Sequence, residues 1–166
     1  DFRIEKVSAE SNFIDVKYLG NSFNSKKLNL LLKISENIQR LDLSNIDLSS
    51  VNISKLKELE NIKYLNLSKT NLSGKNLEIL PENLELLIIN SNPIQAPQLI
   101  KIANNPFINK IFAYNTINNE ELEKSLTSET NNKLFFGMSL KDFSSLEGFP
   151  LEKPVSYTHL RAHETP

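Results

Sequence analysis

A short pattern of apolar residues recurs along this chain, and a recurring unit constrains the fold more than any other feature of the sequence. The stretch IKYLNLSKTNL places Ile62, Leu65, Leu67 and Leu72 at steps of 3, 2 and 5 residues. A half-buried strand alternates with a period of two, and a helix repeats about every 3.6 residues. Because neither period fits the whole stretch, the larger repeating unit carries the structural information.

Copies of this unit begin at residues 13, 38, 62, 84, 108 and 131, so successive copies start 22 to 25 residues apart. The first four copies match well, and the last two are degraded. LELLIINSNPI keeps an asparagine at Asn92, where the two preceding copies have Thr70 and Ile46. Such regular spacing predicts stacked units that share one continuous core.

The unit resembles L-x-x-L-x-L-x-x-N/C-x-L, the signature of the leucine-rich repeat family, over residues 13–150. The resemblance implies an α/β repeat fold, a curved solenoid with short parallel strands on its concave face and short helices or 3₁₀ turns on its convex face. Residues 1–12 would then be an N-terminal segment, either a cap or a truncated repeat.

Between the expected strands, apolar residues at helical spacing predict short helices or 3₁₀ turns. Leu28 and Leu31 mark one such segment, and Ile53 and Leu56 mark another. A third helix is predicted within residues 117–126, with an asparagine N-cap and a glutamate three residues further on.

The asparagine position has its own physical explanation. Buried backbone groups in the turn after each strand need partners, and an amide side chain supplies both a donor and an acceptor. Thr70 can do part of this, whereas Ile46 cannot. The second repeat is therefore predicted to be a weak rung of the stack.

The last twelve residues, VSYTHLRAHETP (155–166), do not follow the repeat, and they contain both histidines of the chain. They resemble a translated cloning or sequencing adaptor. We therefore expect residues 155–166 to lie outside the fold and the natural reading frame to continue beyond about Lys153. The missing initiator methionine likewise favours a fragment or a processed start.

Without that tail the chain has neither histidine nor cysteine. Histidine acid–base catalysis, cysteine nucleophiles and soft metal sites then lack their residues. The adjacent Glu120 and Glu121 are better explained by the start of the third predicted helix, where acidic side chains favour the helix dipole. We therefore predict no enzyme activity, no cofactor and no metal.

The composition limits the classes of partner that the chain is expected to bind. The net charge of −1 gives no electrostatic footprint for nucleic acid, and no apolar run reaches the roughly 18 residues of a membrane-spanning helix. The lack of cysteine favours a cytoplasmic or bacterial-effector setting over an extracellular one. The sequence does not specify an oligomeric state.

With Leu65 and Leu67 in the core, the third, fifth and seventh positions of each unit face away from it. Early copies place charged or polar side chains there, and later copies place apolar and aromatic ones, a mixture typical of protein-binding sites. The predicted partner-binding residues are Arg40, Asp42, Tyr64, Asn66, Leu86, Ile88, Lys110, Phe112, Tyr114 and Phe135. The alternative is that the degraded copies are out of register, or that missing parts of the chain cover these residues.

The resemblance thus implies a non-catalytic module that binds a protein or peptide on its concave strand surface. Two alternatives stay open at this point. The chain could be the substrate-recognition arm of a larger enzyme, such as a bacterial effector ubiquitin ligase, or it could be a surface adhesin.

Overall fold

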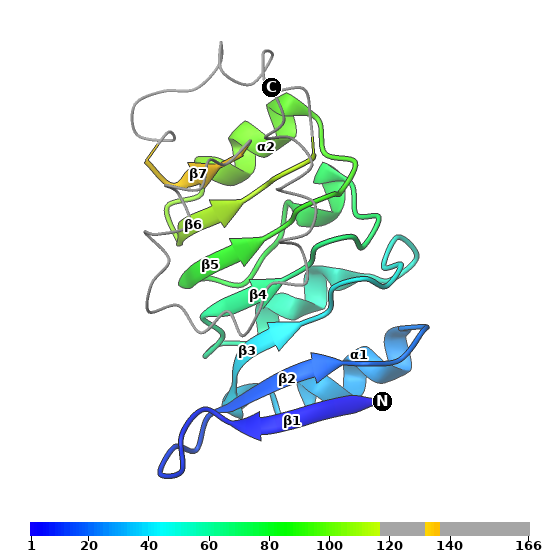
Figure 1. The fold of residues 1–166 in the computed structure, drawn as a ribbon, viewed down its shortest axis with the longest axis vertical. Coiled ribbons are helices and arrows are strands. Elements are labelled where there is room, and N and C mark those ends of the chain that lie inside the picture. The colour runs from blue at the N-terminus through cyan, green and yellow to red at the C-terminus, as the bar shows by residue number, and fades with distance from the viewer. Residues whose placement is uncertain (117–131, 137–166) are drawn as a thin grey trace, which may run out of the picture.

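The computed structural model describes residues 1–116 and 132–136 of the chain. They form one sheet in which the strands follow each other in chain order (Figure 1). Its strands are β1 (Phe2–Lys6), β2 (Ile14–Tyr18), β3 (Ile38–Asp42), β4 (Tyr64–Asn66), β5 (Leu84–Ile88), β6 (Ile108–Phe112) and β7 (Leu134–Phe135). β1 is antiparallel to β2, and every later pair is parallel.

The predicted curved solenoid is wrong. The described residues form an open, mostly parallel sheet with two edges and only a few short helices. The repeat spacing places equivalent strands next to each other. The curvature of the sheet depends instead on the bulk of the segments packed behind it, and these helical segments are short here. Ahead of the first repeat, β1 adds a strand that pairs antiparallel with β2.

Within residues 1–116 and 132–136, the segments behind the sheet are two eight-residue α-helices and three 3₁₀ helices. They are α1 (Ser25–Leu32), η1 (Ser35–Asn37), η2 (Ile53–Glu58), η3 (Gly74–Leu77) and α2 (Ala96–Ala103). The two short helical segments predicted around Leu28 and Ile53 are confirmed as α1 and η2, with their apolar residues buried. The third predicted helix lies outside the described residues.

The core lies between the sheet and these helical segments. Equivalent leucines or isoleucines from neighbouring strands stand side by side, since Leu41 pairs with Leu65 and Leu87 pairs with Ile111. All four are buried, and they join one cluster with Leu56 of η2 and other helical residues. Each strand therefore completes the core of its neighbours, which is why a single unit could not fold alone.

The turn after each inner strand repeats as well. Each of these turns has a residue with a left-handed backbone, φ between 54° and 63°, at Asn45, Lys69, Ser91 and Asn115, and the turn after β4 has a second one at Asn71. Three of these residues donate their N–H groups to the next turn: Asn45 N lies 2.9 Å from Ser68 O, Lys69 N lies 2.9 Å from Asn90 O, and Ser91 N lies 2.8 Å from Tyr114 O. The hydrogen-bonded stack therefore extends beyond the strands into the turns.

Asn92 is the buried side chain that holds two turns together. Its Oδ1 accepts from the backbone N–H groups of Thr70 and Leu72, at 3.1 Å each. Its Nδ2 donates to the carbonyl oxygens of Leu67 at 2.7 Å and Ile89 at 2.9 Å. These four bonds use the full capacity of the amide, so the role predicted for the asparagine position is confirmed at this residue.

The other residues at this position do less. The hydroxyl of Thr70 donates to Leu67 O at 2.7 Å, and that of Thr116 donates to Ala113 O at 2.8 Å. Ile46 offers no polar group, and its side chain is buried in the main core instead. Whether the second repeat is a weak rung stays a prediction.

Replacing Asn92 with alanine should lower the free energy of unfolding by about 3 kcal/mol, because buried N–H and C=O groups lose their partners. Asn76→Ala is the matched control. Asn76 accepts from the backbone N–H and hydroxyl of Ser73 at the start of η3, so its loss should cost about 1 kcal/mol. Urea titration of both variants measures the difference, and equal losses would contradict the role given to Asn92.

Candidate functional site

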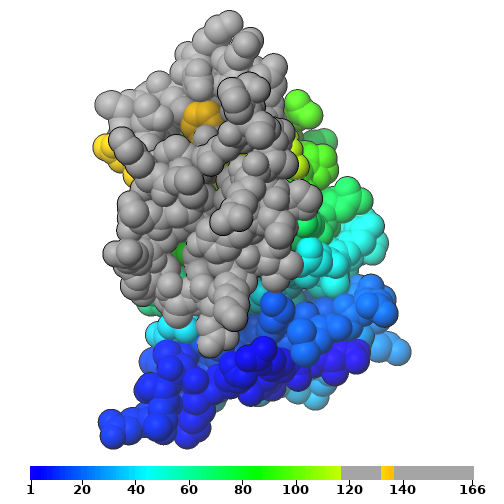
Figure 2. Space-filling model, viewed as in Figure 1, coloured from blue at the N-terminus to red at the C-terminus, as the bar shows by residue number. Residues whose placement is uncertain are grey.

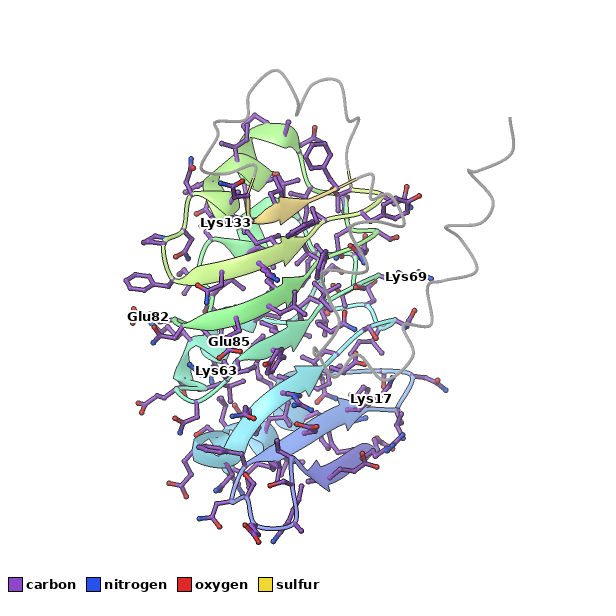
Figure 3. All side chains as sticks on the ribbon, turned by 60° about the vertical axis from the view of Figure 1, so that its left-hand side comes forward. Lys17, Lys63, Lys69, Glu82, Glu85 and Lys133 are labelled. Carbon is purple, nitrogen blue, oxygen red and sulfur yellow. The ribbon has the colours of Figure 1, made fainter. Side chains whose placement is uncertain are left out.

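One side of the sheet faces away from the main core, and we call it the outer sheet face. Its character changes along the sheet, from ion pairs on β1–β3 to apolar and aromatic side chains on β5–β7. Figure 3 shows Lys17 and Lys133 toward opposite ends of this series of strands. The outer sheet face carries Arg3, Glu5, Asp15, Lys17, Arg40, Asp42, Tyr64, Asn66, Leu86, Ile88, Lys110, Phe112, Lys133 and Phe135.

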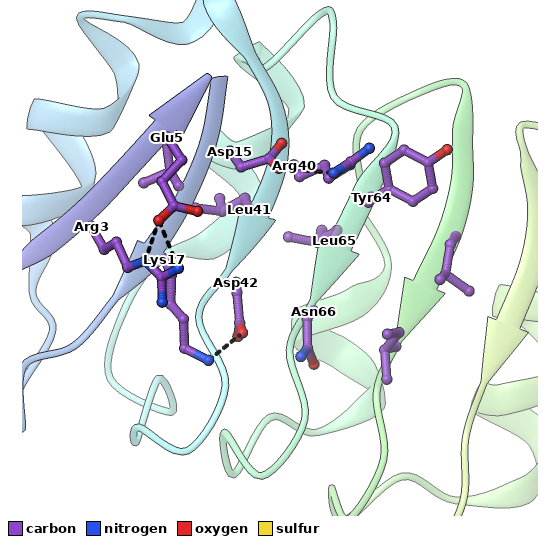
Figure 4. Close-up of a pocket in the computed structure, with 13 residues that line it drawn as sticks. Arg3, Glu5, Asp15, Lys17, Arg40, Leu41, Asp42, Tyr64, Leu65 and Asn66 are labelled. Atoms are coloured by element: carbon purple, nitrogen blue, oxygen red, sulfur yellow. Dashed lines mark hydrogen bonds and ion pairs between the residues drawn. The ribbon is translucent and has the colours of Figure 1, made fainter. Parts of the chain in front are cut away.

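Two ion pairs join β2 to β3 on this face (Figure 4). Arg40 Nη1 lies 2.8 Å from Asp15 Oδ2, and Lys17 Nζ lies 3.1 Å from Asp42 Oδ2. Each pair joins residues that are directly opposite in the strand register. Because all four side chains are partly exposed, each pair contributes at most about 1 kcal/mol, and its main effect is to fix side-chain positions.

Tyr64 stands at the boundary between the charged and apolar parts. The Arg40 guanidinium carbon lies 5.1 Å from its ring centroid, a cation–π geometry. On its other side, the phenol donates a hydrogen bond to Glu85 Oε2 at 2.8 Å. Burial, followed by the hydrogen bond to Glu85 and the negative charge of Glu85, raises the pKa of the Tyr64 phenol above its ordinary value. Tyr64 therefore stays a hydrogen-bond donor at neutral pH.

A hollow of about 280 Å³ lies over the charged part and reaches the apolar part. It is lined by β1–β5, including Arg3, Glu5, Lys17, Arg40, Asp42, Tyr64, Asn66, Leu86 and Ile88. Arg40 Nε is buried there and has no hydrogen-bond partner. The hollow therefore combines charged groups of both signs, an aromatic ring and aliphatic side chains within one small volume.

The apolar part is a second cluster, on the opposite side of the sheet from the main core. Leu86 is 1% exposed and Phe112 is 3% exposed, and Tyr64, Ile88 and Phe135 pack against them. The rings of Phe112 and Phe135 lie 5.1 Å apart between centroids. Leu86 and Phe112, two of the predicted partner-binding residues, are therefore buried, and Tyr64, Ile88 and Phe135 at the edges of the cluster are partly exposed.

Six of the ten predicted partner-binding residues line the hollow: Arg40, Asp42, Tyr64, Asn66, Leu86 and Ile88. The other four, Lys110, Phe112, Tyr114 and Phe135, do not line it. Asp42 and Asn66 also have a local role, since their side chains accept from the backbone N–H groups of Ser44 at 2.9 Å and Ser68 at 3.0 Å.

The sequence analysis missed the contribution of β1. Residues 1–12 were expected to be a cap or a truncated repeat, yet Arg3 and Glu5 line the hollow. A signal was available, because Phe2 and Ile4 alternate with Arg3 and Glu5 at the period of a strand. Glu85 was missed because it lies outside the three outward positions of the unit.

Other kinds of site find no support in the described part of the chain. No group of three or more histidine, cysteine, aspartate or glutamate side chains is placed there to hold a metal ion. None of its helices has the length and apolar composition needed to cross a membrane.

No known family model matches this sequence, and no curated protein matches it significantly. The resemblance to leucine-rich repeats therefore stays a prediction from the repeat pattern.

Phe112→Ala should lower the free energy of unfolding by about 3 to 5 kcal/mol, because it empties a buried aromatic site. Phe107→Ala is the matched control, since Phe107 is 48% exposed and its loss should cost less than about 1 kcal/mol. Thermal and urea unfolding measure both. If Phe112→Ala proved as stable as the control, Phe112 would be exposed in solution.

Glu85→Gln should lower the pKa of Tyr64 toward the ordinary value of about 10, because it removes the negative charge beside the phenol. Part of the upward shift should persist, since burial remains. NMR titration of the tyrosine ring carbons, assigned with Tyr64→Phe, measures the change. Glu82→Gln removes an exposed carboxylate nearby and should leave Tyr64 unaffected, so equal effects of the two variants would rule out a specific contact.

Proposed function

We propose that this chain binds a protein or a peptide over the hollow of the outer sheet face and has no catalytic activity of its own. One observation carries the proposal. A single hollow places paired charges, the Tyr64 ring and the Ile88 side chain side by side. Arginine and tyrosine are over-represented among residues that dominate protein-binding energy.

The size of the hollow favours a side chain over a whole small molecule. Its volume of about 280 Å³ is below or at the lower end of the pockets that enclose drug-sized ligands, about 300 to 1,000 Å³. One or two side chains of a partner fill such a space, while the neighbouring strands offer a surface to the rest of the segment. This is the arrangement of an anchor in a pocket with a polar rim.

The charges around the hollow favour a partner with both signs of charge. Three cations, Arg3, Lys17 and Arg40, and three anions, Glu5, Asp15 and Asp42, line it. Their sum is zero, so the site lacks the positive field that phosphate backbones require. A partner segment with an apolar or aromatic side chain between an acidic and a basic residue would complement both the charges and the Tyr64 edge.

The pairing of these groups supports a binding role over a catalytic one. Asp15 and Asp42 are held in ion pairs by Arg40 and Lys17, so both carboxylates serve to position side chains on the outer sheet face. Two alternative functions were predicted from the sequence, the recognition arm of a larger enzyme and an adhesin. No feature of the described residues favours either one, so both stay predictions.

A phage-displayed library of random peptides, selected on the immobilised full chain, tests the proposal. Selected peptides should bind Tyr64→Ala and Arg40→Ala at least about tenfold more weakly than the parent chain. Isothermal titration measures the affinities, and circular dichroism verifies that the variants are folded.

Lys57→Ala is the control, because Lys57 is exposed on η2, whose apolar residues pack into the main core behind the sheet. It should bind the selected peptides as the parent chain does. Selection of no peptide, or of peptides that bind all three variants equally, would contradict the proposal.

A further inference from the structure

The outer edge of β1 is an exposed strand edge. β1 is the first strand in the order of the sheet, so within the described residues it has a neighbour on one side only. Four of its five residues are exposed, and Ile4 is an apolar residue that is 52% exposed. Edges of this kind are templates for pairing with another strand.

The hydrogen-bond phase of the β1–β2 ladder shows which backbone groups point outward. Leu19 N donates to Asp1 O at 2.8 Å, and Val7 N donates to Phe13 O at 3.0 Å. In an antiparallel ladder, hydrogen-bonded pairs alternate with pairs that are not. Odd-numbered residues of β1 therefore bond to β2, and the N–H and C=O groups of Phe2, Ile4 and Lys6 point away from the sheet.

The sequence of β1, FRIEK, is complementary to itself in one antiparallel register. When Ile4 faces Ile4 of a second copy, Arg3 faces Glu5 and Phe2 faces Lys6, each twice by symmetry. The outward backbone groups of Phe2, Ile4 and Lys6 then meet each other, as the ladder phase requires. Arg3 and Glu5 fall in the pairs without hydrogen bonds, where side chains approach most closely.

The neighbouring registers that keep the same phase are disfavoured. A shift of two residues in one direction sets Arg3 against Arg3, and a shift in the other direction sets Glu5 against Glu5. Like charges directly opposite each other are destabilising. The charges of β1 therefore select a single register, whereas charges that only protected an edge would need no such order.

The pairing of β1 with β2 inside the chain does not place opposite charges across from each other. β1 lies against β2 with Arg3 opposite Lys17 and Glu5 opposite Asp15, both like-charge pairs. Within β1, Arg3 forms an ion pair with Glu5 of the same strand at 2.6 Å. A second copy of β1 would place opposite charges where the β2 neighbour places like ones.

We propose that two copies of this chain associate through their β1 edges, in an antiparallel pairing centred on Ile4 that joins the two sheets across a two-fold axis. Figure 2 shows the residues near the N-terminus (dark blue) at the surface of the lower part of the molecule, and β1 is the end strand of the sheet in Figure 1. A two-fold pairing needs only one self-complementary surface. Because a five-residue edge buries little area, the dimer is weak and forms at high protein concentration.

Sedimentation velocity of the full chain without any peptide, from about 10 µM to about 1 mM, tests the proposal, with an expected dissociation constant inside that range. Arg3→Glu places a glutamate opposite Glu5 of the second copy, so it should weaken the dimer at least about tenfold. It breaks the exposed ion pair with Glu5 of the same strand and replaces a like-charge pair with Lys17 by an opposite one, so the melting temperature should change little.

The double variant Arg3→Glu/Glu5→Arg restores opposite charges across the axis and should recover the dimer. Ile4→Lys should abolish it, whereas Ile79→Lys, at a residue of similar exposure (49%) away from β1, should not. Amide exchange should slow at Phe2, Ile4 and Lys6 as the protein concentration rises.

A monomer at about 1 mM would overturn the proposal. So would a dimer that Arg3→Glu leaves intact, or one that the double variant fails to restore. The peptide-binding proposal is not affected by these outcomes, because its test uses variants on β3 and β4 and reads peptide affinity.

Discussion

Hydrogen bonds between equivalent backbone positions of neighbouring repeats are the interaction on which the rest of this structure depends. They run through the strands from β2 to β7 and continue through the turns, where Lys69 and Ser91 each bond to the next repeat. Asn92 adds four side-chain bonds within the turns. Because this stack fixes the relative height of every repeat, it also fixes which side chains lie next to each other on both faces of the sheet.

The same register explains the division of the outer sheet face. Positions that face outward carry ion pairs at one end of the sheet and a buried aromatic cluster at the other. Tyr64 joins the two parts, since it contacts Arg40 through its ring and Glu85 through its hydroxyl, and packs against the apolar cluster. The proposed binding site lies where the character of the face changes.

Much of the local structure could be predicted from the sequence, because it depends on residues close together in a repeat. The outward or inward direction of Leu65 and Leu67, the helical segments at Leu28 and Ile53, and the role of Asn92 all follow from short patterns. The overall shape could not be predicted, since curvature depends on how the segments behind the sheet pack. The burial of Phe112 was missed for a related reason, because alternation gives the face on which a side chain lies but not what packs against it.

The left-handed residues in the turns bear on which substitutions the fold tolerates. A left-handed backbone costs an ordinary side chain roughly 1 to 2 kcal/mol, less for asparagine and least for glycine. Asn45 and Asn115 meet this demand with the residue type that bears it best after glycine, while Lys69 and Ser91 do not. A change to glycine at Lys69 or Ser91 would therefore raise the free energy of unfolding. Neither change would alter a strand, the core or the outer sheet face.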